Sequence, residues 1–116
     1  MDELNSTYSQ SVAYDAALQG MVLLKNNEAL PLKAGMKLAV VGPMGNTTQL
    51  LFSDYETAGF DNDDTIFSHL STVNTGGTTT FEEGVSVTGG NTTAESLASV
   101  SAADVTILAI GLVRKL

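Results

Sequence analysis

Acidic side chains gather around a tyrosine near the middle of the chain. The segment holds Tyr55 and five carboxylates: Asp54, Glu56, Asp61, Asp63 and Asp64. Two carboxylates can hydrolyse a glycosidic bond when they are held about 5 Å apart, one as nucleophile and one as general acid and base. Closeness in sequence does not establish that geometry, and acidic residues before a helix commonly serve as exposed caps. We therefore interpret the cluster as solvated caps and keep the catalytic pair as an alternative.

Metal sites and activated nucleophiles fit the sequence poorly. Counted from Asp61, a calcium loop would need glycine at its sixth position and glutamate at its twelfth, but Ile66 and Thr72 stand there. His69 is the single histidine and the chain has no cysteine, so a zinc site lacks ligands. No GxSxG motif accompanies His69, which leaves a Ser-His-Asp site without support. We expect neither a metal nor a cofactor.

The segment GPMGNTT, residues 42–48, follows a predicted strand. In doubly wound folds this is where phosphates bind the N-terminus of a helix. The segment lacks both GxGxxG and the GK[ST] signature of a phosphate-binding loop. A plain strand-to-helix turn is the favoured interpretation, and nucleotide binding is the alternative. In either case the loop is expected at the carboxyl edge of the sheet, where ligands of α/β proteins bind.

The composition indicates one small globular domain. The chain has 116 residues, 43% of them hydrophobic and 16% charged, and a formal net charge of −8. Its five basic residues are scattered or terminal, whereas nucleic acids and anionic membranes require clustered Lys and Arg. The longest apolar run is far shorter than the ~20 residues of a membrane span. We therefore predict no nucleic-acid and no membrane partner.

Apolar periodicity predicts a helix in the first third of the chain. Apolar residues recur with helical spacing over residues 11–25, which predicts a helix of about 14 residues that ends near Asn26. Pro31 cannot continue a helix. Leu30 and Leu32 flank this proline and are expected to pack as hydrophobic plugs.

Two apolar runs rich in β-branched residues predict buried strands, Lys37–Val41 and residues 103–111. Helical patterns lie between them, so we predict that Lys37–Val41 and residues 105–110 pair in a parallel sheet with crossover helices. Residues 78–81 and 85–87 are candidates for an additional strand, and the Gly and Thr cluster at residues 75–80 predicts a loop.

Capping residues predict where the intervening helices begin. Asn46 could cap a helix that runs through Phe52, and Asp63 or Asp64 could cap residues 65–70. Thr93 could cap a helix over residues 94–100.

Three segments of the sequence resemble, in the same order, segments of one protein family. MVLLKNNEALPL (residues 21–32), KLAVVGP (37–43) and ADVTILAIGL (103–112) are similar to the opening of the C-terminal α/β domain of glycoside hydrolase family 3, which contains β-glucosidases and β-xylosidases. The resemblance implies an α/β fold, a three-layer sandwich with a mainly parallel sheet. Residues 13–112 would form part of that domain, between a polar N-terminal segment (1–12) and a divergent tail (113–116).

The resemblance also implies a β-glycoside or oligosaccharide substrate and an N-terminal barrel domain that these residues do not contain. In the family, the barrel supplies the catalytic Asp, and the acid/base Glu comes from loops beyond the strand that here ends at Gly111. No catalytic residue is therefore assigned in this chain.

Within the resemblance, residues 50–60 (LLFSDYETAGF) match a family segment that often reads LLGDY or GGW and presents an aromatic ring to a bound sugar. A tyrosine offers a sugar both a stacking surface and a hydrogen-bonding tip. Tyr55, followed by Asp54, is the candidate substrate-binding residue. Phe52 and Ser53 stand where the family commonly has glycine, and a Tyr55 that packs under the loop is the alternative.

We interpret the chain as part of a family 3 glycosidase. The alternative is a standalone, non-enzymatic α/β ligand-binding or scaffold module. A standalone domain should cover its sheet, whereas a partial domain should leave an apolar edge strand or a bare sheet face. Three glycosylation sequons, at Asn5, Asn46 and Asn91, favour an extracellular location, with any signal peptide upstream because the N-terminus here is acidic and polar.

Overall fold

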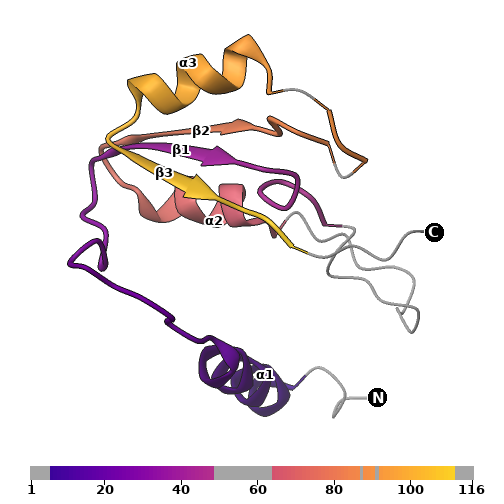
Figure 1. Cartoon of the computed structure of the whole chain (residues 1–116). Helices are drawn as coiled ribbons and strands as arrows, with labels where there is room; N and C mark the ends of the chain where they lie inside the picture. Colours follow the sequence, from indigo (N-terminus) through magenta and orange to yellow (C-terminus); the bar gives the residue numbers. More distant parts are fainter. Residues whose placement is uncertain (1–5, 49–63, 87, 91, 112–116) are drawn as a thin grey trace. The chain divides into compact units, whose positions relative to one another are not determined.

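The computed structural model describes residues 6–48, 64–86, 88–90 and 92–111. The chain divides into two compact units, Met1–Leu32 and Lys33–Leu116. Among the described residues, the first unit contains one helix, and the second contains a three-stranded sheet with two helices (Figure 1).

Helix α1 of the first unit spans Thr7–Gly20. Its N-cap is Ser6, whose hydroxyl accepts a backbone amide of the first turn at 3.1 Å. Met21 follows the helix in an extended conformation. The prediction of a helix over residues 11–25 is therefore wrong at both ends. The helix begins earlier because Ser6 caps it, and it ends earlier at a glycine, which favours helix less than other residues except proline.

Asn26 closes a local turn instead of ending the helix. Its Nδ2 donates to the Leu30 carbonyl at 2.9 Å, and its Oδ1 accepts the Leu30 amide at 3.0 Å. These bonds give the backbone a partner outside a helix. Leu30 is 47% exposed, so the prediction that it packs as a buried plug is wrong.

The second unit is built on three parallel strands: β1 (Lys37–Val41), β2 (Thr78–Glu82) and β3 (Val105–Leu108). Their order across the sheet is β2-β1-β3, so the strand that comes first in the sequence lies in the middle (Figure 1). Val40 lies opposite Phe81 of β2 and Ile107 of β3. The predicted parallel pairing of β1 with the last strand is confirmed.

Helices α2 (Ile66–Val73) and α3 (Ala94–Ala102) lie on opposite faces of the sheet (Figure 1). Helix α3 contacts β1 and β2, and α2 contacts β2. The core is centred on β1, where Leu38, Ala39 and Val40 are buried. A central parallel strand is covered on both faces, which explains its continuous apolar run. The predicted three-layer α/β class is confirmed.

Strand β3 is less well covered than β1. Its burial alternates along the strand. Leu108 is 63% exposed, and Ile110, just beyond the strand, is 70% exposed. In the part of the chain that the structure describes, no strand pairs with the outer edge of β3. An apolar edge of this kind favours pairing or packing with another segment.

Both helices of the second unit begin at threonine caps. Thr93 caps α3, as predicted, and its hydroxyl accepts a first-turn amide at 3.2 Å. The cap of α2 is Thr65, which forms a reciprocal capping box with Ser68. The prediction of Asp63 or Asp64 as the cap is wrong, because the Thr65 hydroxyl already satisfies the first-turn amide. No helix among the described residues is long and apolar enough to cross a membrane.

The remaining predicted elements have mixed outcomes. Asn46 ends a turn, and Thr47 and Thr48 are not helical, while the rest of the helix predicted through Phe52 lies outside the described residues. The strand predicted at residues 78–81 is confirmed as β2. Near residues 85–87 the described chain has an isolated bridge between Ser86 and Gly89 in place of a strand.

The C-cap of α2, Asn74, attaches that helix to the start of the sheet. Asn74 is 7% exposed. Its Nδ2 donates to the Met36 carbonyl at 2.8 Å, and its Oδ1 accepts the Gly35 amide at 3.0 Å. Nδ2 also lies 3.3 Å from the Thr78 carbonyl. One buried side chain thus satisfies backbone groups at the entrances to β1 and β2.

Candidate functional site

The loop after β1, residues 42–48, lies at the carboxyl edge of the sheet, where open α/β folds bind ligands. The Gly42 amide donates to the Glu82 carbonyl at the end of β2, at 3.1 Å. The Met44 amide donates to the Ala109 carbonyl just beyond β3, at 3.2 Å. The loop therefore joins the ends of both outer strands.

Two glycines let this loop approach the core closely. Gly42 has a φ of +118°, and a Cβ atom there would lie 2.3 Å from the Ala109 carbonyl oxygen. A Cβ atom on Gly45 would lie 2.8 Å from side-chain carbons of both Val40 and Phe81. Both distances are far below van der Waals contact, so the backbone of the loop itself forms part of the packed core.

Three backbone amides of the loop bond to carbonyl groups of the protein. Besides the bonds of Gly42 and Met44, the Gly45 amide donates to the Gly42 carbonyl at 3.0 Å. A phosphate-binding loop must instead offer several free backbone amides to the anion. The structure therefore favours the plain turn over the nucleotide-binding alternative.

The loop is also attached to the start of α2. The Thr65 hydroxyl donates to Asn46 Oδ1 at 2.9 Å, and the Phe67 amide donates to the Gly45 carbonyl at 2.9 Å. The ring of Phe67 lies 5.8 Å from that of Phe81, at a tilt of 42°. Hydrogen bonds therefore attach the loop to the start of α2, and the aromatic contact attaches α2 to β2.

The two candidate substrate-binding residues, Asp54 and Tyr55, lie outside the described residues, within the segment 49–63. The described residues on either side belong to the loop and to the start of α2. Among these flanking residues, Asn46 is hydrogen-bonded to Thr65. The assignments of Asp54 and Tyr55 stay predictions.

The acidic cluster is described only at Asp64, since its other members fall in the same segment. Asp64 Oδ1 lies 3.4 Å from His69 Nε2, and both side chains are 67% exposed. Exposed ion pairs contribute roughly 0–1 kcal/mol. The described residues contain no group of three or more His, Asp or Glu side chains that could hold a metal.

Glu82 is a carboxylate at the carboxyl edge that the sequence analysis did not single out. It ends β2, lies opposite Val41 and is partly buried. The sequence contains a signal for this carboxylate, because two glutamates directly follow the strand predicted at residues 78–81.

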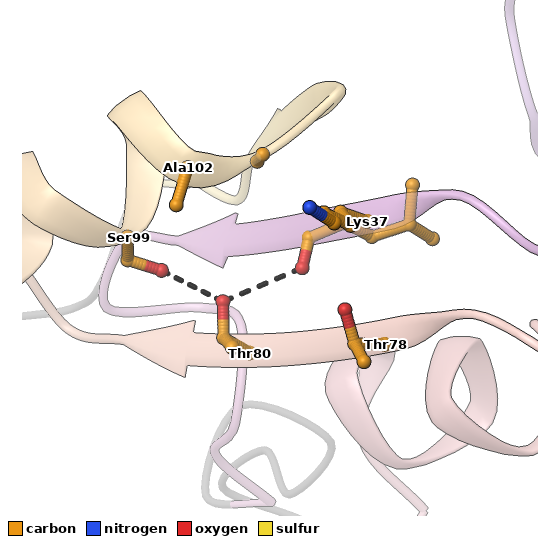
Figure 2. A pocket seen from close by; sticks show the side chains of 7 residues that line it. Lys37, Thr78, Thr80, Ser99 and Ala102 are labelled. Carbon is orange, nitrogen blue, oxygen red and sulfur yellow. Dashed lines mark hydrogen bonds between the residues drawn. The ribbon is translucent and has the colours of Figure 1, made fainter.

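A shallow pocket of about 150 Å³ lies at the opposite, amino edge of the sheet, beneath α3 (Figure 2). Two of its hydroxyl groups bind each other: Thr80 Oγ1 lies 2.7 Å from Ser99 Oγ and also donates to the Leu38 carbonyl at 3.4 Å. The pocket is far from the edge where α/β folds bind ligands, and we interpret it as a gap in helix-sheet packing.

The fold and its carboxyl-edge loop define a parallel, three-layer α/β domain. A family model described as the glycosyl hydrolase family 3 C-terminal domain matches residues 21–115. The chain belongs to this family through that C-terminal domain.

Several fungal proteins are similar to part of the chain. It is 47% identical over 55 residues to the exo-1,4-beta-xylosidase xlnD of Emericella nidulans, and 43% identical over 54 residues to a probable exo-1,4-beta-xylosidase xlnD of Neosartorya fischeri. Each match covers 47% of this chain and 7% of the relative. A probable exo-1,4-beta-xylosidase bxlB of Aspergillus terreus is 46% identical over 48 residues, which are 41% of this chain and 6% of the relative. No solved structure matches the chain.

Proposed function

We propose that this chain forms part of a secreted β-xylosidase and contributes a wall of its sugar pocket from the carboxyl edge of the sheet. The observation that carries the proposal is membership of glycosyl hydrolase family 3 together with the exo-1,4-beta-xylosidase names of the similar fungal proteins. These names favour a β-xyloside over a β-glucoside as the substrate. An N-terminal barrel domain would supply the catalytic nucleophile.

The exposed outer edge of β3 favours the interpretation of the chain as a partial domain over its interpretation as a standalone module. Leu108 and Ile110 are exposed at β3, whose outer edge has no partner strand in the described part of the chain. A standalone module would gain stability by covering these side chains, since each buried aliphatic side chain contributes about 1.5–3 kcal/mol. Packing of a further segment against β3 in the longer enzyme would cover them.

The proposed pocket contact is Tyr55, with Asp54 beside it. The attachment of the described residues on either side, Asn46 and Thr65, at the carboxyl edge of the sheet supports this proposal. A stacked ring is a platform for the apolar face of a sugar, and its hydroxyl can bond to a sugar hydroxyl.

Tyr55→Ala in the longer enzyme is expected to lower kcat/KM for an aryl β-xyloside about 5- to 150-fold, because loss of a stacked ring costs about 1–3 kcal/mol. Steady-state kinetics and thermal melting of the same preparation measure the effect. Tyr14→Ala is the matched control, because Tyr14 is 64% exposed in α1. If Tyr55→Ala lowers the melting temperature and leaves the kinetics of the folded fraction unchanged, Tyr55 is a packing residue.

The purified 116-residue chain is expected to hydrolyse neither aryl β-xylosides nor aryl β-glucosides. Hydrolysis requires two carboxylates held about 5 Å or more apart across the scissile bond, and the family resemblance assigns neither of them to this chain. A chromogenic assay with the longer enzyme as positive control makes the measurement. Turnover by the short chain that disappears on changing Asp54 or Asp64 would make the acidic cluster the catalytic site.

A further inference from the structure

We propose that Asn46 carries an N-linked glycan when the chain passes through a eukaryotic secretory pathway. Asn46 begins the sequon Asn46-Thr47-Thr48, and asparagine in such a sequon is the acceptor of N-glycosylation. This site goes beyond the proposed glycosidase role, because it concerns a covalent modification of the chain and not the sugar that an enzyme would cleave.

The first supporting observation is the position of Asn46 in the folded chain. The residue is exposed and lies in the turn that ends the loop after β1. A glycan is bulky and hydrophilic, so a folded protein tolerates it only at a surface position. Asn5 and Asn91, which begin the other two sequons, lie outside the described residues.

The second observation is the orientation of the side-chain amide. Thr65 is 8% exposed, and its hydroxyl accepts the Ser68 amide at 3.0 Å while it donates to Asn46 at 2.9 Å. In this structure the Asn46 atom that faces Thr65 is the amide oxygen, which accepts the hydroxyl proton. This bond uses Oδ1, whereas the glycan attaches at Nδ2. Glycosylation is therefore compatible with the contact that joins the loop to α2.

The transfer needs only chemistry that the secretory pathway supplies. The donor class is an oligosaccharide linked to a lipid diphosphate. A bond forms between Nδ2 and the anomeric carbon of the first sugar, and the bond from that carbon to the diphosphate oxygen breaks. The diphosphate leaves with the electron pair, and Nδ2 loses one proton.

The test is expression of the chain in yeast behind a cleavable signal peptide, with peptide mass spectrometry on both the secreted protein and the protein retained in the pathway. Peptide N-glycosidase leaves an aspartate wherever it removes a glycan, which locates each modified position. We expect the glycan at Asn46, whether or not Asn5 and Asn91 are also modified. An unmodified Asn46 in protein that has entered the pathway overturns the proposal.

Three variants separate the modification from a change in folding. Asn46→Asp removes the acceptor nitrogen but keeps an oxygen for Thr65, and Thr48→Ala removes the sequon hydroxyl while Asn46 stays in place. Both should lose one glycan. Thr48→Ser is the matched control and should keep it, because serine also completes the sequon. Retention of the same glycan in Asn46→Asp would contradict the assignment.

Discussion

Gly42→Ala should destabilise the sheet unit by more than about 3 kcal/mol, since a non-glycine residue in a disfavoured backbone region already costs roughly 1–3 kcal/mol. The second contribution is steric. The new Cβ would lie 2.3 Å from the Ala109 carbonyl oxygen, which is backbone and cannot rotate away. Relief requires the loop to leave the end of β3 and thus breaks the bond between Met44 and Ala109. Urea denaturation followed by circular dichroism measures the loss.

Gly76→Ala is the matched control for this prediction. Gly76 also has a positive φ, +78°, but nothing lies within 4 Å of a Cβ atom built there. It should therefore show the backbone cost alone, about 1–2 kcal/mol. Equal losses of unfolding free energy in the two variants would show that the loop shifts to accommodate the new methyl group. The close approach at Gly42 would then contribute nothing to stability.

Asn74→Ala should lower the free energy of unfolding by about 2–4 kcal/mol, because a buried group left without its partner costs roughly 1–3 kcal/mol and more than one group is affected. Removal of the side chain deprives the Gly35 amide of its acceptor and the Met36 and Thr78 carbonyls of one donor each, although the Met36 carbonyl still accepts the Thr78 amide. The same denaturation experiment measures the effect. Protection of the β1 amides against hydrogen exchange should fall with it, since Asn74 holds the entrance to that strand.

Asn26→Ala provides the comparison for Asn74. Asn26 also makes two bonds to backbone, both with Leu30, but they are exposed to solvent. Water can replace them, so the loss should be below about 1 kcal/mol. If Asn74→Ala lowered the free energy of unfolding as little as Asn26→Ala, this would indicate that water replaces the lost hydrogen bonds. The Asn74 side chain would then not be needed to link α2 to the sheet.

Local sequence patterns predicted the centre of the fold well. The run Lys37–Val41 has the bounds of β1, because a strand covered on both faces carries an uninterrupted apolar sequence between glycines. Thr93 marked the start of α3 for an equally local reason. The helix prediction extended too far because apolar residues continue beyond Gly20. Met21 is extended there, and the exposed side chains that follow provide no packing to prolong a helix.

The candidate site was predictable in position but not in detail. The rule that ligands gather at the carboxyl edge of a parallel sheet located the loop after β1. Nothing local signalled Asn74, whose partners Gly35 and Met36 are 39 and 38 residues away in the sequence. The hydrogen bond between Asn46 and Thr65 could not be predicted from local patterns either, because it joins residues 19 apart in the sequence. Contacts of this kind arise only once the sheet has brought distant segments together.

The central place of β1 has a consequence for the newly made chain as it leaves the ribosome. Synthesis delivers β1 first, yet both of its neighbours come later. The bond from Thr80 to Leu38 spans 42 residues, and the bond from the Lys37 amide to Asp104 spans 67. Until those residues emerge, β1 exposes two unpaired edges on a strongly apolar strand, which is a template for association with other chains. The β2 segment pairs with one edge of β1, and the other edge stays unpaired until β3 emerges. A pause in translation after β2 and before β3 therefore prolongs the interval in which chaperone binding would protect the growing chain.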